Sequence, residues 1–302
     1  MKTIRVIICL IAFLGLLNFI PMLAHAFETE LVAWWKFEKN EKGKTLDSVG
    51  RVEDLISGNY KYVRGVSGDA IRFDGFTTVV SRAAAKAPVL SGTFSVEAWV
   101  AVAAYPWNWC PVVAQEKGEQ TGYYFGVGPK GEVELSVSLN GEWKTCISND
   151  RIPLRKWTHL AASFDQNKGI KVYVDGRLSA ELAVNRAFAQ ARDTDLIIGM
   201  NREKKTPSNP VRPQATLPAW YSFDGIIDEL KIYNRILTQK EFEQIFQSAL
   251  PTTAPDIPQR VMPSGPAGPG RFGAYYAQLK YYEEWDNLWR IGPDADVVVQ
   301  FD

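Results

Sequence analysis

Carboxylates whose spacing could support glycoside hydrolysis are the first residues to consider. That reaction needs an acid/base and a nucleophile facing each other across the glycosidic bond, which one strand can supply in an E-x-D-x-x-E pattern. No such pattern occurs between residues 31 and 248. Glu97, beside Trp99 in the run FSVEAWV, is the one carboxylate placed for the surface of a sheet. Because a single carboxylate does not cleave a glycoside by this mechanism, we predict no catalytic residue in this region.

His159 is the other residue type that could support catalysis. A histidine-activated nucleophile also needs an orienting acid and an accessible hydroxyl or thiol. No G-x-S-x-G motif is present, and Cys110 and Cys146 both fall in strand-like sequence. His159 alternates with Leu160 in WTHLAASF, which places it opposite the expected core. We therefore expect a structural or sheet-face role for this histidine.

Aromatic residues in loops indicate sugar recognition, because the C–H faces of sugars stack on flat rings. A ring in a loop is less often part of the core than a ring in a strand. Packing beneath the loop remains the alternative for the first two of the following residues. The predicted ligand-binding aromatics are Trp107 and Trp109 in AYPWNWCP, Trp143 after an Asn-Gly turn, and Trp220 and Tyr221 at the end of a long insertion.

The N-terminal segment predicts export. Lys2 and Arg5 precede an apolar run over residues 6–23, and Ala-His-Ala at 24–26 matches a small-residue cleavage site. We expect a signal peptide over residues 1–26 and a secreted, extracellular or periplasmic protein. A signal anchor is the alternative, because the run is just long enough to span a bilayer.

Removal of residues 1–26 leaves 32 basic and 34 acidic side chains, a net charge of −2. This balance gives no basic footprint for nucleic acid, and no later segment is apolar enough to span a membrane. An exported chain with Cys110 and Cys146 could form one disulfide. The bridge requires their strands to pair in register, and two buried free thiols are the alternative.

Hydrophobic alternation predicts an all-β domain over residues 27–250. In EVELSVSL, apolar residues alternate with polar ones, so one face is expected to be buried and the other wet. Short strands separated by Gly, Asp and Asn turns favour a sandwich or barrel. One helix is predicted by the capping box Thr238 to Glu241, with Leu237 stapled onto Phe242, and it should close the domain.

A Pro- and Gly-rich stretch over residues 251–270 is typical of a stiff, extended linker. Residues 271–302 then resume globular composition with a heavy aromatic load that 32 residues cannot bury alone. We interpret them as the start of a second, truncated domain. A C-terminal extension packed on the sandwich is the alternative.

Seven segments in order carry a family resemblance: LVAWWKFEKNEKGKTLDSVG, GDAIRFDG, FSVEAWV, RKWTHLAASFD, IKVYVDGRLSAE, LIIGMNR and FDGIIDELKIYNRILTQKEFEQIF. Over about residues 31–248 the chain resembles the laminin-G-like jelly roll of bacterial secreted proteins, within the concanavalin A-like lectin/glucanase superfamily. The resemblance implies a two-sheet antiparallel jelly-roll sandwich with one C-terminal capping helix, whose first and last strands pair.

The resemblance also implies a structural Ca²⁺ near the junction of the first and last strands. Hard cations take carboxylate and carbonyl oxygens, and the matching acids are Asp47, Asp74 and Asp228, with Glu38 nearby. Turn capping by Asp without any metal is the alternative.

Three functions are consistent with these observations. The first is a secreted, non-catalytic carbohydrate-binding or adhesion module whose partner is a polysaccharide or other glycan. The second is an N-terminal accessory domain of a polysaccharide-degrading enzyme, with the catalytic domain missing from this chain. The third is a protein-binding surface domain. Since fold does not fix function, the resemblance alone does not choose among them.

Overall fold

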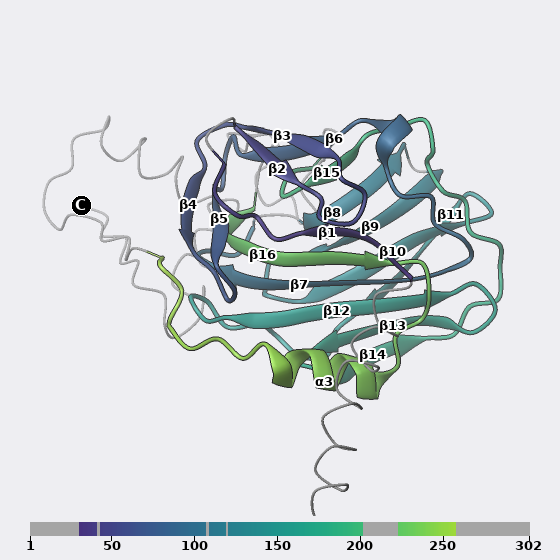
Figure 1. Ribbon diagram of the computed structural model, residues 1–302. Helices are drawn as coiled ribbons and strands as arrows, with labels where there is room; N and C mark the ends of the chain where they lie inside the picture. The colour runs from purple at the N-terminus through teal and green to yellow at the C-terminus, as the bar shows by residue number, and fades with distance from the viewer. Residues whose placement is uncertain (1–29, 41–42, 107–108, 119, 202–222, 258–302) are drawn as a thin grey trace, which may run out of the picture.

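The computed structural model describes residues 30–40, 43–106, 109–118, 120–201 and 223–257, and the structural statements below concern these residues. Two antiparallel sheets of eight strands each pack face to face, and the one α-helix among the described residues follows the last strand (Figure 1). This architecture confirms the predicted jelly-roll sandwich. No described helix has the length and apolar character needed to cross a membrane.

Sheet A contains eight strands, with β7 (Thr93–Val102) and β16 (Asp224–Tyr233) near its middle. Its order is β14 (Arg177–Leu182), β13 (Gly169–Val174), β12 (Thr158–Asp165), β7, β16, β5 (Asp69–Asp74) and β4 (Lys61–Arg64), and β1 (Leu31–Trp35) also pairs with β16.

Sheet B forms the other layer. Its order is β11 (Glu142–Ile147), β10 (Val133–Leu139), β9 (Thr121–Val127), β8 (Cys110–Lys117), β15 (Leu196–Ile198), β6 (Val79–Arg82), β3 (Glu53–Ser57) and β2 (Lys44–Leu46). A single 3₁₀ turn, η1 (Ala84–Lys86), follows β6.

The core between the sheets is built by alternating apolar residues, as the sequence predicts. On β10 the residues Val133, Leu135, Val137 and Leu139 are fully buried in this core. The expectation that the other face of β10 is wet is wrong, because Glu134, Ser136 and Ser138 are also buried. Ser138 donates to the Gln120 carbonyl and Ser136 exchanges a hydrogen bond with Thr145, so these polar groups are satisfied within the protein.

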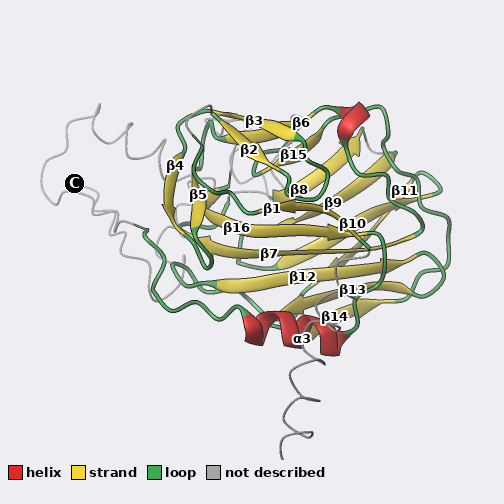
Figure 2. Ribbon diagram, viewed as in Figure 1, coloured by secondary structure: helices red, strands yellow, loops and turns green. Residues whose placement is uncertain are grey.

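The first and last strands pair as predicted, with Trp35 opposite Leu230 in the β1–β16 ladder. Helix α3 (Gln239–Ser248) begins at the predicted capping box: the Glu241 N–H donates to Thr238 Oγ1, and the Glu241 carboxylate accepts from the Thr238 N–H at 2.7 Å. Both residues of the predicted staple, Leu237 and Phe242, are fully buried. Figure 2 shows α3 as the one α-helix beside the strands of sheet A.

Residues 249–257 continue from α3 along the outer face of sheet A (Figure 1). Leu250, two residues beyond the end of α3, is 49% exposed. Ile257 instead packs with Trp157 against a small cluster that includes Ala101 and Ile226. The first part of the predicted linker therefore covers sheet A.

Cys110 and Cys146 are buried free thiols, so the predicted disulfide is wrong for this structure. Their strands, β8 and β11, are separated by β9 and β10. Three strand spacings of about 4.8 Å exceed the roughly 7 Å between Cα atoms that a disulfide spans. Burial raises the pKa of the Cys146 thiol to about 11, which keeps it protonated and unreactive.

Candidate functional site

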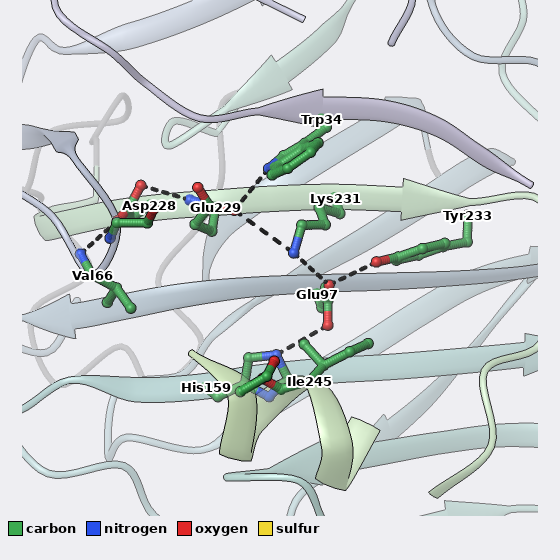
Figure 3. Close-up of polar contacts among 11 residues, drawn as sticks. Trp34, Val66, Glu97, His159, Asp228, Glu229, Lys231, Tyr233 and Ile245 are labelled. Carbon is green, nitrogen blue, oxygen red and sulfur yellow. Dashed lines mark hydrogen bonds and ion pairs between the residues drawn. The ribbon is translucent and has the colours of Figure 1, made fainter. Parts of the chain in front are cut away.

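Glu97 and His159 meet on the outer face of sheet A, where the sequence places both of them. The Glu97 Oε2 atom lies 3.1 Å from His159 Nε2. Its Oε1 atom accepts from the Tyr233 hydroxyl at 2.8 Å and from the Lys231 ammonium at 3.1 Å (Figure 3). Lys231 also lies 3.7 Å from Glu229, which accepts the indole N–H of Trp34 at 2.8 Å. We call Glu97, His159, Lys231 and Tyr233 the Glu97 cluster.

The charges of the Glu97 cluster are set by burial and by these contacts. Burial by itself raises the pKa of Glu97, but the Lys231 charge, the His159 contact and the Tyr233 hydroxyl outweigh it and lower the pKa to about 2. Burial and the neighbouring carboxylate raise the pKa of Tyr233. Glu97 is therefore an acceptor-only carboxylate at neutral pH, held by three donors.

Helix α3 closes this part of sheet A. The Phe246 ring stacks on Trp99 with ring centres 5.7 Å apart, and Phe242 packs on Tyr173 at 4.6 Å. Glu97 and His159 are each 1% exposed. His159 Nδ1 is buried without a hydrogen-bond partner, so no orienting acid holds the far side of the ring. The Glu97 cluster is thus closed to solvent, and a structural role for His159 stays the prediction.

Lys231 and Tyr233 are members of this cluster that the sequence reasoning missed. A β-bulge between Asp228 and Lys231 shifts the register of β16, which places Lys231 opposite Glu97. Glu229 occupies the bulge at φ +49°. The alternation of Lys231 and Tyr233 in KIYN indicates that the two side chains share one face of β16. The sequence does not indicate the bulge, because the residue at positive φ is a glutamate and not the glycine that often marks a bulge.

The first predicted calcium ligand, Asp47, belongs to a buried ion network between the sheets. Its Oδ2 atom accepts from Arg82 at 2.9 Å, and its Oδ1 atom accepts from the backbone N–H groups of Trp34 and Val49. Arg82 also pairs with Asp54 at 2.6 Å. Arg82 carries one positive charge against these two carboxylates, and both oxygens of Asp47 already accept hydrogen bonds within this network.

Asp74 and Asp228 are likewise engaged by protein donors. Asp74 caps the turn after β5, where the Thr77 hydroxyl and three backbone N–H groups outweigh burial and lower its pKa to about 2. Asp228 accepts from the N–H groups of Val66 and Ser67, but burial and the Glu229 charge raise its pKa to about 8. Within the described ranges, no group of three or more His, Cys, Asp or Glu side chains could hold a metal ion. Protein donors thus already contact all three acids, and their assignment as calcium ligands stays a prediction.

The outer face of sheet B differs from that of sheet A, against which α3 packs: among the described residues, no α-helix lies on sheet B. The strand registers align one row of outward residues across all eight strands. The row is Lys44, Leu55, Ser81, Ile197, Ala114, Tyr124, Ser136 and Thr145. It is apolar toward β3, where Leu55 is 54% exposed, and ends at β11 in the hydroxyl pair of Ser136 and Thr145, 2.7 Å apart.

Two of the predicted ligand-binding tryptophans lie on this face, Trp143 on the edge strand β11 and Trp109 near the middle of the sheet. Trp143 stands on β11 opposite Ser138 and is partly exposed. Trp109, also partly exposed, lies directly before β8, with its indole against Gly128 at the end of β9. Trp107, Trp220 and Tyr221 lie outside the described residues, as do the predicted signal peptide and the predicted second domain.

Two carboxylates also project from this face, but their Cα atoms lie far apart. Glu116 is aligned with Gly122, and Glu134 is aligned with Gly126, on opposite sides of β9. Two strand spacings across and four residues along put their Cα atoms about 17 Å apart. The carboxyl groups of a retaining glycosidase lie only about 5 Å apart. This pair is therefore not placed as the nucleophile and acid of such an enzyme.

Comparisons with known proteins agree with the geometry. A family model described as concanavalin A-like lectin/glucanases superfamily matches residues 74–242. No curated protein matches the chain.

Several solved structures share the fold. Domain 4 of AbnA, an extracellular arabinanase from Geobacillus stearothermophilus in complex with arabinotriose, is 23% identical with a TM-score of 0.55, over 72% of this chain and 98% of that one. The binding domain of Paraclostridial Mosquitocidal Protein 1 is 16% identical with a TM-score of 0.53, and that of botulinum neurotoxin DC in complex with SialylT is 13% identical with a TM-score of 0.50. These two alignments cover 72% and 73% of this chain and about half (52%) of each toxin chain.

Proposed function

The chain belongs to the concanavalin A-like lectin/glucanases superfamily, and from this premise we propose that it is a secreted, non-catalytic carbohydrate-binding module that uses the outer face of sheet B. The observation that carries the proposal is the contrast between the two outer faces. Sheet A is covered by α3. On sheet B the middle of the outward row is buried at Ala114, Tyr124 and Ser136, but Trp109 and Trp143 are partly exposed and Thr145, the partner of Ser136, is exposed.

The chemistry of this surface suits a sugar. Indole rings provide flat apolar area for the C–H face of a pyranose or furanose ring, and hydroxyl groups both donate and accept hydrogen bonds with sugar hydroxyls. Trp143 is aligned with Ser138 on β10, whereas Trp109 lies at the opposite end of β9, so the hydroxyl pair lies between the two rings. Such spacing favours an extended oligosaccharide over a single sugar.

The proposal of a binding module without catalysis has separate support. Glu97 is enclosed beneath α3, and Glu116 and Glu134 are too far apart to act as an acid and a nucleophile. Export of the chain is supported by the leader pattern of residues 1–26.

The test is glycan binding by the full chain, measured on an array and by calorimetry with oligosaccharides such as arabinotriose. We expect Kd values between micromolar and millimolar, with Trp109→Ala and Trp143→Ala each weakening binding about tenfold or more. Trp34→Phe, on the other sheet, is the matched control and should leave Kd unchanged. Binding of no glycan by the wild-type chain would refute the proposal and favour a protein-binding surface.

A second candidate function is an accessory domain of a polysaccharide-degrading enzyme. The alignment that covers 98% of domain 4 of an extracellular arabinanase favours it, since that domain is one unit of a larger enzyme. Sequencing the DNA downstream of the codon for Asp302 tests this candidate. A stop codon at that point would remove it.

A structural calcium ion stays a proposal without an assigned ligand set. It is tested by the melting temperature with calcium and with EDTA. A lower melting temperature in EDTA would support bound calcium, and equal values would remove it.

A further inference from the structure

Gly128 is a glycine whose backbone does not require one. It follows the last residue of β9 and opens the turn to β10, with its N–H donating to the Glu132 carbonyl at 2.8 Å. Unlike Gly122 or Gly131, it does not have a positive φ, so any residue could adopt its backbone conformation. The reason for a glycine must therefore lie in the space above it.

Two side chains occupy that space. A Cβ atom at residue 128 would lie 2.7 Å from Cη2 and Cζ3 of Trp109, and 2.8 Å from Oε2 of Glu132. All three of these nearest atoms belong to side chains, and none belongs to the backbone. Glu132 is itself oriented, because its Oε2 accepts from the Lys130 N–H at 2.9 Å. Because Gly128 has no side chain, the edge of the Trp109 indole and the Glu132 carboxylate can both lie against its Cα atom.

We propose that Gly128 is a positioning residue that seats the Trp109 indole against β9 beside Glu132, and that these two side chains form one sugar subsite. A sugar ring stacks on the outer side of the indole, and one of its hydroxyls donates to the Glu132 carboxylate. Ligands with a free hydroxyl next to the stacked face are therefore favoured. This inference rests on the proposed function and adds a position and a hydrogen-bond acceptor to it.

The test is a double-mutant cycle in the full chain, with arabinotriose or the best array ligand as the probe. Gly128→Ala should weaken binding about tenfold, as Trp109→Ala does, because the methyl group lifts the indole off the strand. If Gly128 acts only through Trp109, then Gly128→Ala adds nothing in a Trp109→Ala background. Gly92→Ala is the matched control, because Gly92 also lacks a positive φ and the three atoms nearest to its Cβ all belong to the Gln166 side chain. A multiplicative loss in the double variant would overturn the proposal.

A second measurement needs no ligand. In the chain labelled with 5-fluorotryptophan, the ¹⁹F resonance of Trp109 is assigned from its loss in Trp109→Phe. We expect Gly128→Ala to shift this resonance while Gly92→Ala leaves it in place, with the melting temperature changed by only about 1–2 °C. An unchanged resonance would refute the positioning role even if sugar binding is real. A shifted resonance in a chain that binds no glycan would confirm the positioning role and refute the proposed function.

Discussion

The outer faces of sheets A and B both hold carboxylates that are almost fully buried, yet the two faces are covered in different ways. On sheet A, Glu97 is held by three side-chain donors beneath the rings of α3. On sheet B, Glu134 is aligned with Gly126 and Ile147, on the face that also carries the partly exposed Trp109 and Trp143. The difference teaches that a buried carboxylate can be a structural part of a sheet, so that the two faces need separate tests of function.

The largest expected effect that separates the faces is Glu97→Ala. Removing the carboxylate leaves the Lys231 ammonium and the Tyr233 hydroxyl buried without their acceptor, which costs about 3 kcal/mol or more of unfolding free energy. Urea denaturation measures this loss. Glycan Kd for the folded fraction should stay at the wild-type value. A weakened Kd with intact stability would reverse the assignment of the two faces.

Phe242→Ala tests whether α3 is part of the same folded unit. The side chain is fully buried against Tyr173, and its truncation should cost about 3 kcal/mol. The matched control is Gln244→Ala on the exposed side of α3, with an expected change below about 0.5 kcal/mol. Hydrogen exchange that rises in α3 alone, with sheet A still protected, would show that the helix detaches separately.

The acid dependence of stability should come largely from sheet A. The folded-state pKa of Glu97 is about 2, below the unfolded value of about 4.3. Its contribution is therefore fully present above about pH 4.3 and is lost as the pH falls toward 2. Glu97→Gln should lower the unfolding free energy at pH 7 and flatten this part of the curve. Parallel curves for variant and wild type between pH 2 and 5 would contradict the depressed pKa.

The sequence predicts which side of its strand a residue lies on better than which strands lie beside it. Alternation in FSVEAWV and WTHLAASF places Glu97 and His159 opposite the core, and the β7–β12 ladder aligns His159 with Trp99. What alternation cannot supply is the order of strands. Alternation also cannot supply which strands pair: β16 lies between β7 and β5, whereas Cys110 and Cys146 lie on β8 and β11, the ends of a meander whose sheet order follows the chain.

The shift in register within β16 could not be predicted from the sequence either. Lys231 reaches Glu97 because the bulge at Asp228 and Glu229 moves β16, and a glutamate at positive φ gives no signal in the sequence. The acids predicted as calcium ligands were chosen by their place in motifs. Asp47 is instead bound to Arg82, whose position 35 residues later makes the pair invisible to local patterns.

The smallest expected effect tests the hydroxyls of sheet B without touching a ring. Thr145→Val keeps the shape of an exposed side chain on the edge strand β11 and removes the partner of Ser136 Oγ. Because valine suits a strand, we expect stability to change by less than about 0.5 kcal/mol. Glycan Kd should rise only about three- to fivefold, since one neutral hydrogen bond contributes about 1 kcal/mol. Calorimetry resolves this change, and Thr158→Val, a buried hydroxyl on sheet A, is the control that should leave Kd unchanged. An unchanged Kd in Thr145→Val would confine recognition to the indoles and would separate the polar row from the binding surface.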